Sequence, residues 1–261
     1  MAYVTEPFEE LDVMNYFMFN KLTTVPETAI PFCKCMIKNL LGKEVDKINV
    51  RAEKMEFPDN PEKRGIRLDV QVDEVNGENI VNIFDIEPHR DREKAYPKKN
   101  RFQQAQIDKN NLKSGDDDFT HLPELYIVCI TNYDPFGYDQ MLYLIENQCV
   151  NLPQLEYNDG VHIMYFNTTG TKGGSKALKS FLTYLEDSKD SNVTDDATNE
   201  MSDYVHMIKH NQEIGGRYMT LGNLMDKIAA EAVIEATKEL SSELDKAKDE
   251  ITHNSTSIFI N

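Results

Sequence analysis

The alternation of apolar and polar residues predicts the first helices and strands of the chain. Apolar residues recur with the period of an α-helix from Glu9 to Leu22 and again from Ala29 to Leu41, so two helices open the protein. The segments that follow are extended, and in one of them Leu68, Val70 and Val72 alternate with polar residues. The predicted strands run from Ile48 to Phe57, from Gly65 to Val75 and from Ile80 to Glu87.

The second half of the chain continues the mixed pattern and then becomes helical. The predicted elements are a helix opened by Pro97 and Asn100 and running to about Leu112, strands from Leu125 to Ile130, Met141 to Val150 and His162 to Asn167, and a helix capped by Ser175. The segment from Asp187 to Asn199 is polar and acidic, which is typical of a linker. We therefore expect an α/β domain in residues 1–190 and a linker with a helical tail in residues 191–261.

The helical tail carries two weaker patterns. Its apolar positions are spaced 4-3-4-3-4, which resembles a short heptad seam of a coiled coil, and they are Val233, Thr237, Leu240, Leu244, Ala247 and Ile251. A homo-oligomer through this helix and a helix packed on its own domain are both compatible with such a seam. His206 and His210 stand one helical turn apart, and without a third ligand nearby they are interpreted as surface histidines.

Charge and composition narrow the classes of function. The chain has 261 residues, of which 40% are hydrophobic, so it can bury a sizeable core. It lacks a basic leader and any apolar run long enough for a membrane span, which predicts a cytoplasmic protein without membrane contact. A net charge of −17 disfavours an extended, nonspecific grip on nucleic acid.

One window reverses the acidic trend and allows a local contact with DNA. The segment from Arg90 to Lys113 contains eight basic residues and only three acidic ones. The basic residues are Arg90, Arg92, Lys94, Lys98, Lys99, Arg101, Lys109 and Lys113. A solvated helix face is the alternative explanation for such a cluster.

The cysteines give no sign of a disulfide framework or of a zinc site. Cys33, Cys35, Cys129 and Cys149 lie mostly in apolar segments, so reduced and buried thiols are expected. Cys33 and Cys35 lack a second Cys/His pair at metal spacing, and their side chains diverge on a helix.

The candidate chemistry lies on the predicted hairpin of the second and third strands. If residues 77–79 form a three-residue loop, Asn76 faces Ile80 and Asp69 faces Glu87, with both acids on one face. Two opposed carboxylates repel each other unless a cation lies between them, and an all-oxygen pair suits Mg²⁺ or Mn²⁺. The alternative is that both acids lie on the solvent side of an amphipathic hairpin.

Several motifs, taken together, resemble those of the PD-(D/E)XK nuclease superfamily, and more narrowly its recombination-promoting nuclease / putative transposase branch. The order of helices and strands is similar, with Asp in the second strand and Glu in the third. The matching segments cover about residues 10–190 and include Asn15 to Phe19, Gly65 to Val70, Asn82 to Glu87, Arg101 to Asp108, Thr131 to Gly137, Glu146 with Asn147, and Phe166 to Gly170. The resemblance implies a restriction-endonuclease-like mixed sheet flanked by helices.

The resemblance also implies roles for individual residues. Asp69 and Glu87 match the metal-binding acids, with the backbone carbonyl of Pro88 as a further candidate ligand. The implied catalytic set is Asp69, Glu87, His89 and Gln104, and the implied DNA-binding set is Lys98, Lys99, Arg101 and Gln104. The implied function is a Mg²⁺- or Mn²⁺-dependent DNA endonuclease linked to recombination or transposition.

Two departures from the branch keep a second function open. Asn15 and Tyr16 stand where the branch usually bears an acid, with Asp12 one turn earlier as a conceivable substitute. His89 stands where the superfamily has lysine and this branch usually has glutamine, and a neutral imidazole supplies no permanent charge. A degenerate copy that binds DNA or a protein without cutting is therefore the alternative, and nothing in the sequence excludes RNA as the substrate.

Overall fold

The computed structural model describes residues 6–56, 66–92, 95–112 and 118–258, and it confirms the predicted α/β fold class. One sheet of six strands has the order β1-β2-β3-β4-β6-β5. The strands are β1 (Ile48–Glu56), β2 (Ile66–Asn76), β3 (Asn79–His89), β4 (Glu124–Thr131), β5 (Leu142–Ile145) and β6 (Val161–Asn167). The helices are α1 (Tyr16–Thr24), α2 (Pro26–Leu41), α3 (Tyr96–Asn111), α4 (Lys176–Glu186), α5 (Asp196–Lys209) and α6 (Gln212–Ile258).

The sheet is mixed, as a restriction-endonuclease-like fold requires. The strand β2 is antiparallel to both β1 and β3, whereas β4 runs parallel to both β3 and β6. The edge strand β5 is antiparallel to β6. The chain forms two compact units, of which the larger spans Glu10 to His210 and contains the whole sheet with α1 to α5. The smaller unit joins the described residues before Glu10 to those after His210.

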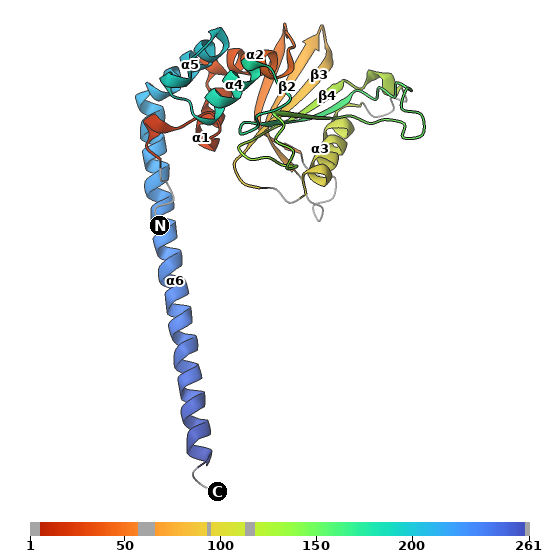
Figure 1. The fold of residues 1–261 in the computed structure, drawn as a ribbon. Helices are drawn as coiled ribbons and strands as arrows, with labels where there is room; N and C mark the ends of the chain where they lie inside the picture. Colours follow the sequence, from red (N-terminus) through yellow and green to blue (C-terminus); the bar gives the residue numbers. More distant parts are fainter. Residues whose placement is uncertain (1–5, 57–65, 93–94, 113–117, 259–261) are drawn as a thin grey trace. The chain divides into compact units, whose positions relative to one another are not determined.

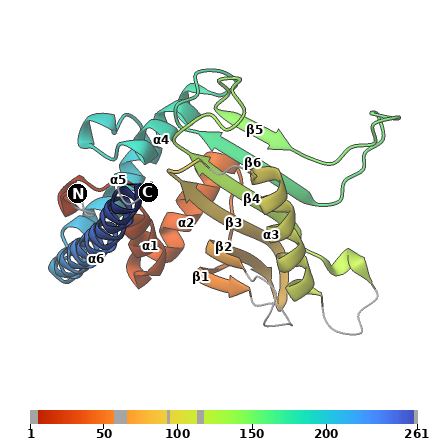
Figure 2. The same ribbon diagram turned by 90° about the horizontal axis from the view of Figure 1, so that it is seen from below.

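Helices cover both faces of the sheet within the larger unit (Figures 1 and 2). The group of α1, α2, α4 and α5 lies on one side, where the alternating residues Val70, Val72, Phe84 and Ile86 are buried as predicted. The opposite face is covered by α3. Its apolar core consists of Ile83, Tyr96, Ile107, Leu125, Ile127, Cys129 and Tyr165.

Two predicted elements have other bounds in the structure. The first helix starts only at Tyr16, where the Asn15 side chain accepts a hydrogen bond from the Phe17 N–H at 2.9 Å and so caps α1. The strand predicted from Met141 to Val150 is shorter in the structure, where β5 ends at Ile145. The ends predicted for the strands at Phe57 and Gly65 lie outside the described residues.

The predicted linker is wrong, because its residues belong to the larger unit. The 3₁₀ helix η3 (Asp190–Asn192) and the first residues of α5 replace it. Asp195 and Thr198 form a reciprocal capping box at the start of α5, and Met201 and Val205 of this helix are buried. Sequence polarity alone suggested a linker here because most residues from 187 to 199 are polar and at least partly exposed.

The remaining sequence expectations concern cysteines, histidines and membrane spans. Cys33, Cys35 and Cys129 are buried free thiols, whereas Cys149 is only half-buried. His206 lies 3.0 Å from Asp190 and His210 is exposed, in keeping with surface histidines. Among the described residues, no helix combines the length and the apolar character that a membrane crossing needs.

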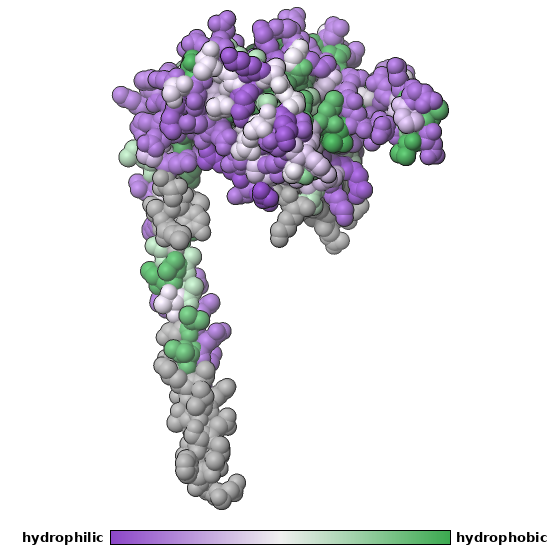
Figure 3. Space-filling view, viewed as in Figure 1, coloured by the Kyte–Doolittle hydropathy of each residue, from purple (hydrophilic) through white to green (hydrophobic). Residues whose placement is uncertain are grey.

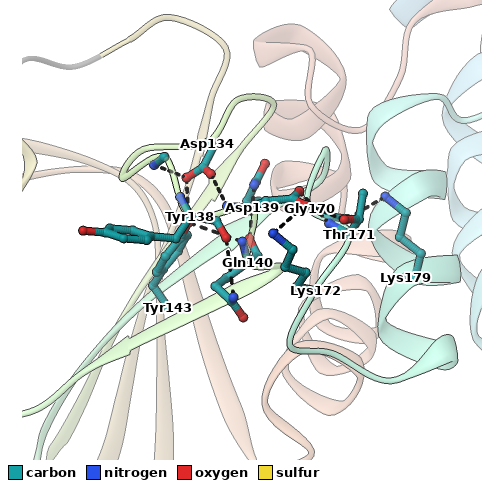
Figure 4. A network of polar contacts seen from close by, with 11 residues as sticks. Asp134, Tyr138, Asp139, Gln140, Tyr143, Gly170, Thr171, Lys172 and Lys179 are labelled. Carbon is teal, nitrogen blue, oxygen red and sulfur yellow. Dashed lines mark hydrogen bonds and ion pairs between the residues drawn. The ribbon is translucent and has the colours of Figure 1, made fainter.

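A polar network fixes the loops that leave the parallel strands β4 and β6 (Figure 4). Asp134 accepts hydrogen bonds from the backbone N–H groups of Phe136, Gly137 and Asp139, and from the Tyr143 hydroxyl at 2.7 Å. Asp139 in turn accepts from the backbone N–H of Thr171 at 3.0 Å, which joins the two loops. Because parallel strands end at the same edge, these loops lie beside the end of β3 at His89.

The carboxylate of Asp134 depends on these donors. Although partial burial alone raises the pKa of Asp134, hydrogen bonds from Tyr143 and three backbone N–H groups outweigh burial and lower the pKa from 3.8 to about 2. A carboxyl whose folded-state pKa is lowered stabilises the fold above its ordinary pKa and loses that contribution as the pH falls through about 2.

We expect Asp134→Asn to lower the free energy of unfolding by about 1 kcal/mol near neutral pH, a value that allows for solvent screening of this loop. The difference between the variant and the wild type should shrink as the pH falls through about 2. Urea unfolding followed by circular dichroism at several pH values measures it, with Asp203→Asn on the exposed surface of α5 as the control. A difference that stays constant with pH would contradict the assignment.

Candidate active site

The hairpin of β2 and β3 has the predicted register along most of its length. Val70 pairs with Ile86 and Gln71 with Asp85. Continuing this register by one residue places Asp69 opposite Glu87, so both acids belong to one face of the sheet. The two acids therefore meet the geometric condition on which a shared cation depends.

The turn of the hairpin differs from the prediction. Asn76 pairs with Asn79 and not with Ile80, across a two-residue turn. The register shifts by one residue between Glu74 and Val75, and this irregularity restores the predicted pairing further along. Gly77 has a φ of 63°, the left-handed conformation that this tight turn requires.

This polar face of the hairpin is buried, which excludes the solvent-side alternative for most of it. Gln71, Asp73 and Asp85 are 0% exposed and Glu87 is 2% exposed, while Asp69 is half-buried. The buried carboxylates need partners, because an unpaired ionised group in a protein interior costs several kcal/mol. The partners come from β1, from α3 and from the hairpin itself.

Glu87 has three partners around its carboxylate. The ammonium of Lys99 lies 2.7 Å from Oε2 and donates to it, and His89 Nε2 lies 3.2 Å from the same oxygen. The side-chain amide of Gln103 donates to Oε1. Burial alone raises the pKa of Glu87, but His89 and Lys99 outweigh burial and hold the pKa below its ordinary value. Glu87 is therefore an ionised carboxylate at neutral pH.

Lys99 is placed differently from the other bases of its helix. Burial alone lowers the pKa of Lys99, yet the attraction of Glu87, with a smaller contribution from Asp69, raises the pKa above its ordinary value. Lys98 and Arg101 are exposed on the outer side of α3. The predicted DNA-binding set thus separates into an inner lysine at the acids and outer bases on the surface.

A different glutamine from the predicted one faces the acids. The Gln103 amide donates to Asp85 at 3.3 Å as well as to Glu87, and its side chain is fully buried. Gln104, predicted for the site, is half-buried and hydrogen-bonds Asp108 instead. One helical position corresponds to a rotation of about 100°, so only one of two neighbouring glutamines can point at the sheet.

The missed residue had a signal in the sequence. The buried positions of α3 are Tyr96, Asn100, Gln103 and Ile107, which are spaced 4-3-4 on one face of the helix. Asn100 continues the polar interior by donating to the Tyr165 hydroxyl at 2.8 Å. The two apolar ends of this stripe would have identified Gln103 as inward-facing.

A shallow pocket of about 470 Å³ lies beside His89. Asn15 and Tyr16, the first of the two departures noted in the sequence, line it together with His89. Asp12, the conceivable substitute, forms an ion pair with Arg90, another lining residue. The carboxylate of Asp12 therefore neutralises the charge of Arg90 in this structure.

The residues on this face fit a hard cation bound through oxygen atoms. The acids Asp69, Asp73, Asp85 and Glu87 outnumber the lysine and arginine that the described residues bring here, which are Lys99 and the Arg51 partner of Asp73. Gln103 Oε1 is buried without a hydrogen-bond partner among the described groups, so it is a further candidate ligand. No three described His, Cys, Asp or Glu side chains are grouped as a complete metal site. Mg²⁺ commonly takes only one or two carboxylates and keeps several waters.

Comparisons of the chain with protein-family models, with curated proteins and with solved structures found no match in any of the three. The geometry and chemistry of this site are therefore the basis for inferring its function.

We expect Gln103→Met to lower the free energy of unfolding by about 1–3 kcal/mol, because two buried carboxylates lose their shared donor while the volume of the side chain is kept. The matched variant Gln104→Met should change it by less than about 0.5 kcal/mol. Urea unfolding of the two variants measures the difference. An equal loss of unfolding free energy in the two variants would show that the hydrogen bonds of Gln103 do not stabilise Asp85 and Glu87.

Proposed function

We propose that this protein is a divalent-metal-dependent DNA endonuclease of the PD-(D/E)XK type, linked to recombination or transposition and acting in the cytoplasm. The observation that carries the proposal is the placement of Glu87 on the hairpin face shared with Asp69, with Lys99 at 2.7 Å from the Glu87 carboxylate. Carboxylates from two adjacent strands and an ammonium from the flanking helix are the groups that phosphodiester hydrolysis needs in one place.

Each residue has a definite role in this proposal. Asp69, Glu87 and the Pro88 carbonyl hold Mg²⁺ or Mn²⁺, which when bound polarises a phosphoryl oxygen and lowers the pKa of a water molecule. Lys99 supplies the permanent positive charge that His89 lacks, and it stabilises negative charge that develops on the phosphate. Gln103 is a positioning residue that fixes the carboxylate of Glu87.

The surface bases provide the contact with DNA. Lys98 and Arg101 are exposed on α3, the helix that carries Lys99, so a phosphate backbone on this surface lies near the acids. Arg92 lies over the Tyr133 ring at 5.4 Å. Lys94 and Lys113 of the basic window fall outside the described residues. A contact confined to this window is compatible with the net charge of −17.

One observation favours the alternative function, a degenerate nuclease fold that binds DNA or a protein without cutting. Both carboxylate oxygens of Glu87 already have partners within the chain, Gln103 at Oε1 and Lys99 at Oε2. A cation must therefore compete with the Lys99 ammonium for Glu87. The degenerate, non-cutting function is the correct one if the ion pair of Lys99 with Glu87 excludes the metal ion.

Incubation of supercoiled plasmid with the pure protein tests the proposal. We expect nicked and linear products with Mg²⁺ or Mn²⁺, and none with Ca²⁺, without metal or with Asp69→Ala. Titration of Mn²⁺ by calorimetry gives a readout independent of activity, and Asp69→Ala should weaken this binding. Retained DNA binding without cleavage under any metal would support the alternative, and cleavage of RNA alone would overturn DNA as the substrate.

The two neighbouring lysines should behave differently. Lys99→Met should lower the rate of cleavage at saturating DNA by about 100-fold or more, since it removes a charge aimed at the reacting phosphate. Lys98→Met should leave that rate nearly unchanged, but should weaken DNA binding and reduce its salt dependence by about one counterion. Rates from gel assays and fluorescence anisotropy at several salt concentrations separate the two. Equal effects on rate would remove Lys99 from the mechanism.

A further inference from the structure

The helix α6 has 47 residues, and most of the large apolar side chains that the structure describes in it are exposed. Its first turns are anchored in the smaller unit: Ile214 and Tyr218 are buried, and the Tyr218 hydroxyl donates to the backbone carbonyl of Glu6 at 3.0 Å. Beyond Tyr218, every large apolar side chain that the structure describes is exposed, as the apolar patches along α6 in Figure 3 illustrate. These are Met219, Leu221, Leu224, Ile228, Val233, Ile234, Leu240 and Leu244.

The later part of α6 carries a seam with the period of a coiled coil. Val233, Thr237, Leu240 and Leu244 are spaced 4-3-4, and the sequence continues the spacing to residues 247 and 251. A repeat of 3.5 residues keeps one stripe facing a partner helix along its whole length. The described charged residues from 231 to 246 all lie off the stripe, and they are Glu231, Glu235, Lys238, Glu239, Glu243 and Lys246.

Thr237 can be buried in this seam without leaving a polar group unsatisfied. Its hydroxyl donates to the backbone carbonyl of Val233, one turn earlier, at 2.7 Å. A hydroxyl with an internal partner avoids the desolvation cost of an unmade hydrogen bond. The one polar residue among the described seam positions is therefore compatible with an apolar interface.

An isolated helix of this composition needs a partner for its stability. Gly215, Gly216 and Gly222 lie in its first turns, and each glycine weakens a helix relative to alanine. Helices in water are generally stabilised by packing of an apolar face and not by propensity alone. Two copies of the four described seam positions would remove roughly 500–1,000 Å² of apolar surface from water, a range that reaches the size of a small specific interface.

We propose that α6 pairs with α6 of a second copy of this chain in a two-stranded coiled coil through the seam of Val233, Thr237, Leu240 and Leu244. A second copy is the occupant that fits, because the seam is uncharged and self-complementary while the charges lie outside it. The net charge of −17 on each chain opposes the association, so the dimer should become tighter as salt screens the repulsion. The inference does not depend on the proposed nuclease function.

Sedimentation equilibrium of the full chain over a wide range of concentrations tests the proposal. We expect a reversible change from the 30.0 kDa of one chain to twice that mass. Leu240→Glu should abolish the dimer, whereas Ala232→Glu, which adds the same charge at an exposed position off the seam, should retain it. Circular dichroism verifies that both variants remain folded.

Thr237→Val gives a test that does not depend on loss of association. If Thr237 lies in the interface, valine at this position should tighten the dimer by about tenfold, since it adds apolar contact in both copies. A single-chain mass at every concentration and salt, a larger assembly, equal dimerisation of Leu240→Glu and Ala232→Glu, or no change with Thr237→Val would each overturn the proposal.

Discussion

The buried carboxylate of Glu87 determines how α3 packs on the sheet. Glu87 is 2% exposed and its pKa is held below the ordinary value, so it is an ionised group with almost no contact with solvent. Burial of an unpaired charge would cost several kcal/mol, and α3 provides the necessary partners through Lys99 and Gln103. The rotation of α3 that turns these two side chains inward also turns Lys98 and Arg101 outward. One ion pair thus arranges both the candidate site and its basic surface.

The interior between α3 and the sheet is unusually polar for a structural core. Asp73, Asp85, Asn100 and Gln103 are all buried there, beside apolar residues such as Ile107. Buried polar groups are retained at a cost in stability, and strongly paired ionisable groups in a protein interior are frequent at functional sites. This polarity supports a catalytic or binding role for the α3 face and distinguishes it from the opposite face of β2 and β3, where Val70, Val72, Phe84 and Ile86 are buried.

The parallel strands bring His89, Thr131 and Asn167 to one edge of the sheet. The ends of β3, β4 and β6 are aligned, with His89 beside Thr131 and Thr131 beside Asn167. The Asp134 network then joins the loops that follow β4 and β6 through hydrogen bonds to their backbone N–H groups.

Local periodicity allowed the sequence alone to predict the fold class, the strands β2 and β3, and the common face of Asp69 and Glu87. Side chains alternate strictly along a strand, so these features depend only on neighbouring residues and on the register of one hairpin. The sequence did not show that this face is buried, that Gln103 and not Gln104 points inward, or that Lys99 differs from Lys98. These features depend on how α3 is rotated against a sheet whose strands are distant in the sequence. The long-range packing of a helix against buried charges decided them, and only the inward orientation of Gln103 had a local signal, the helical spacing from Tyr96 to Ile107.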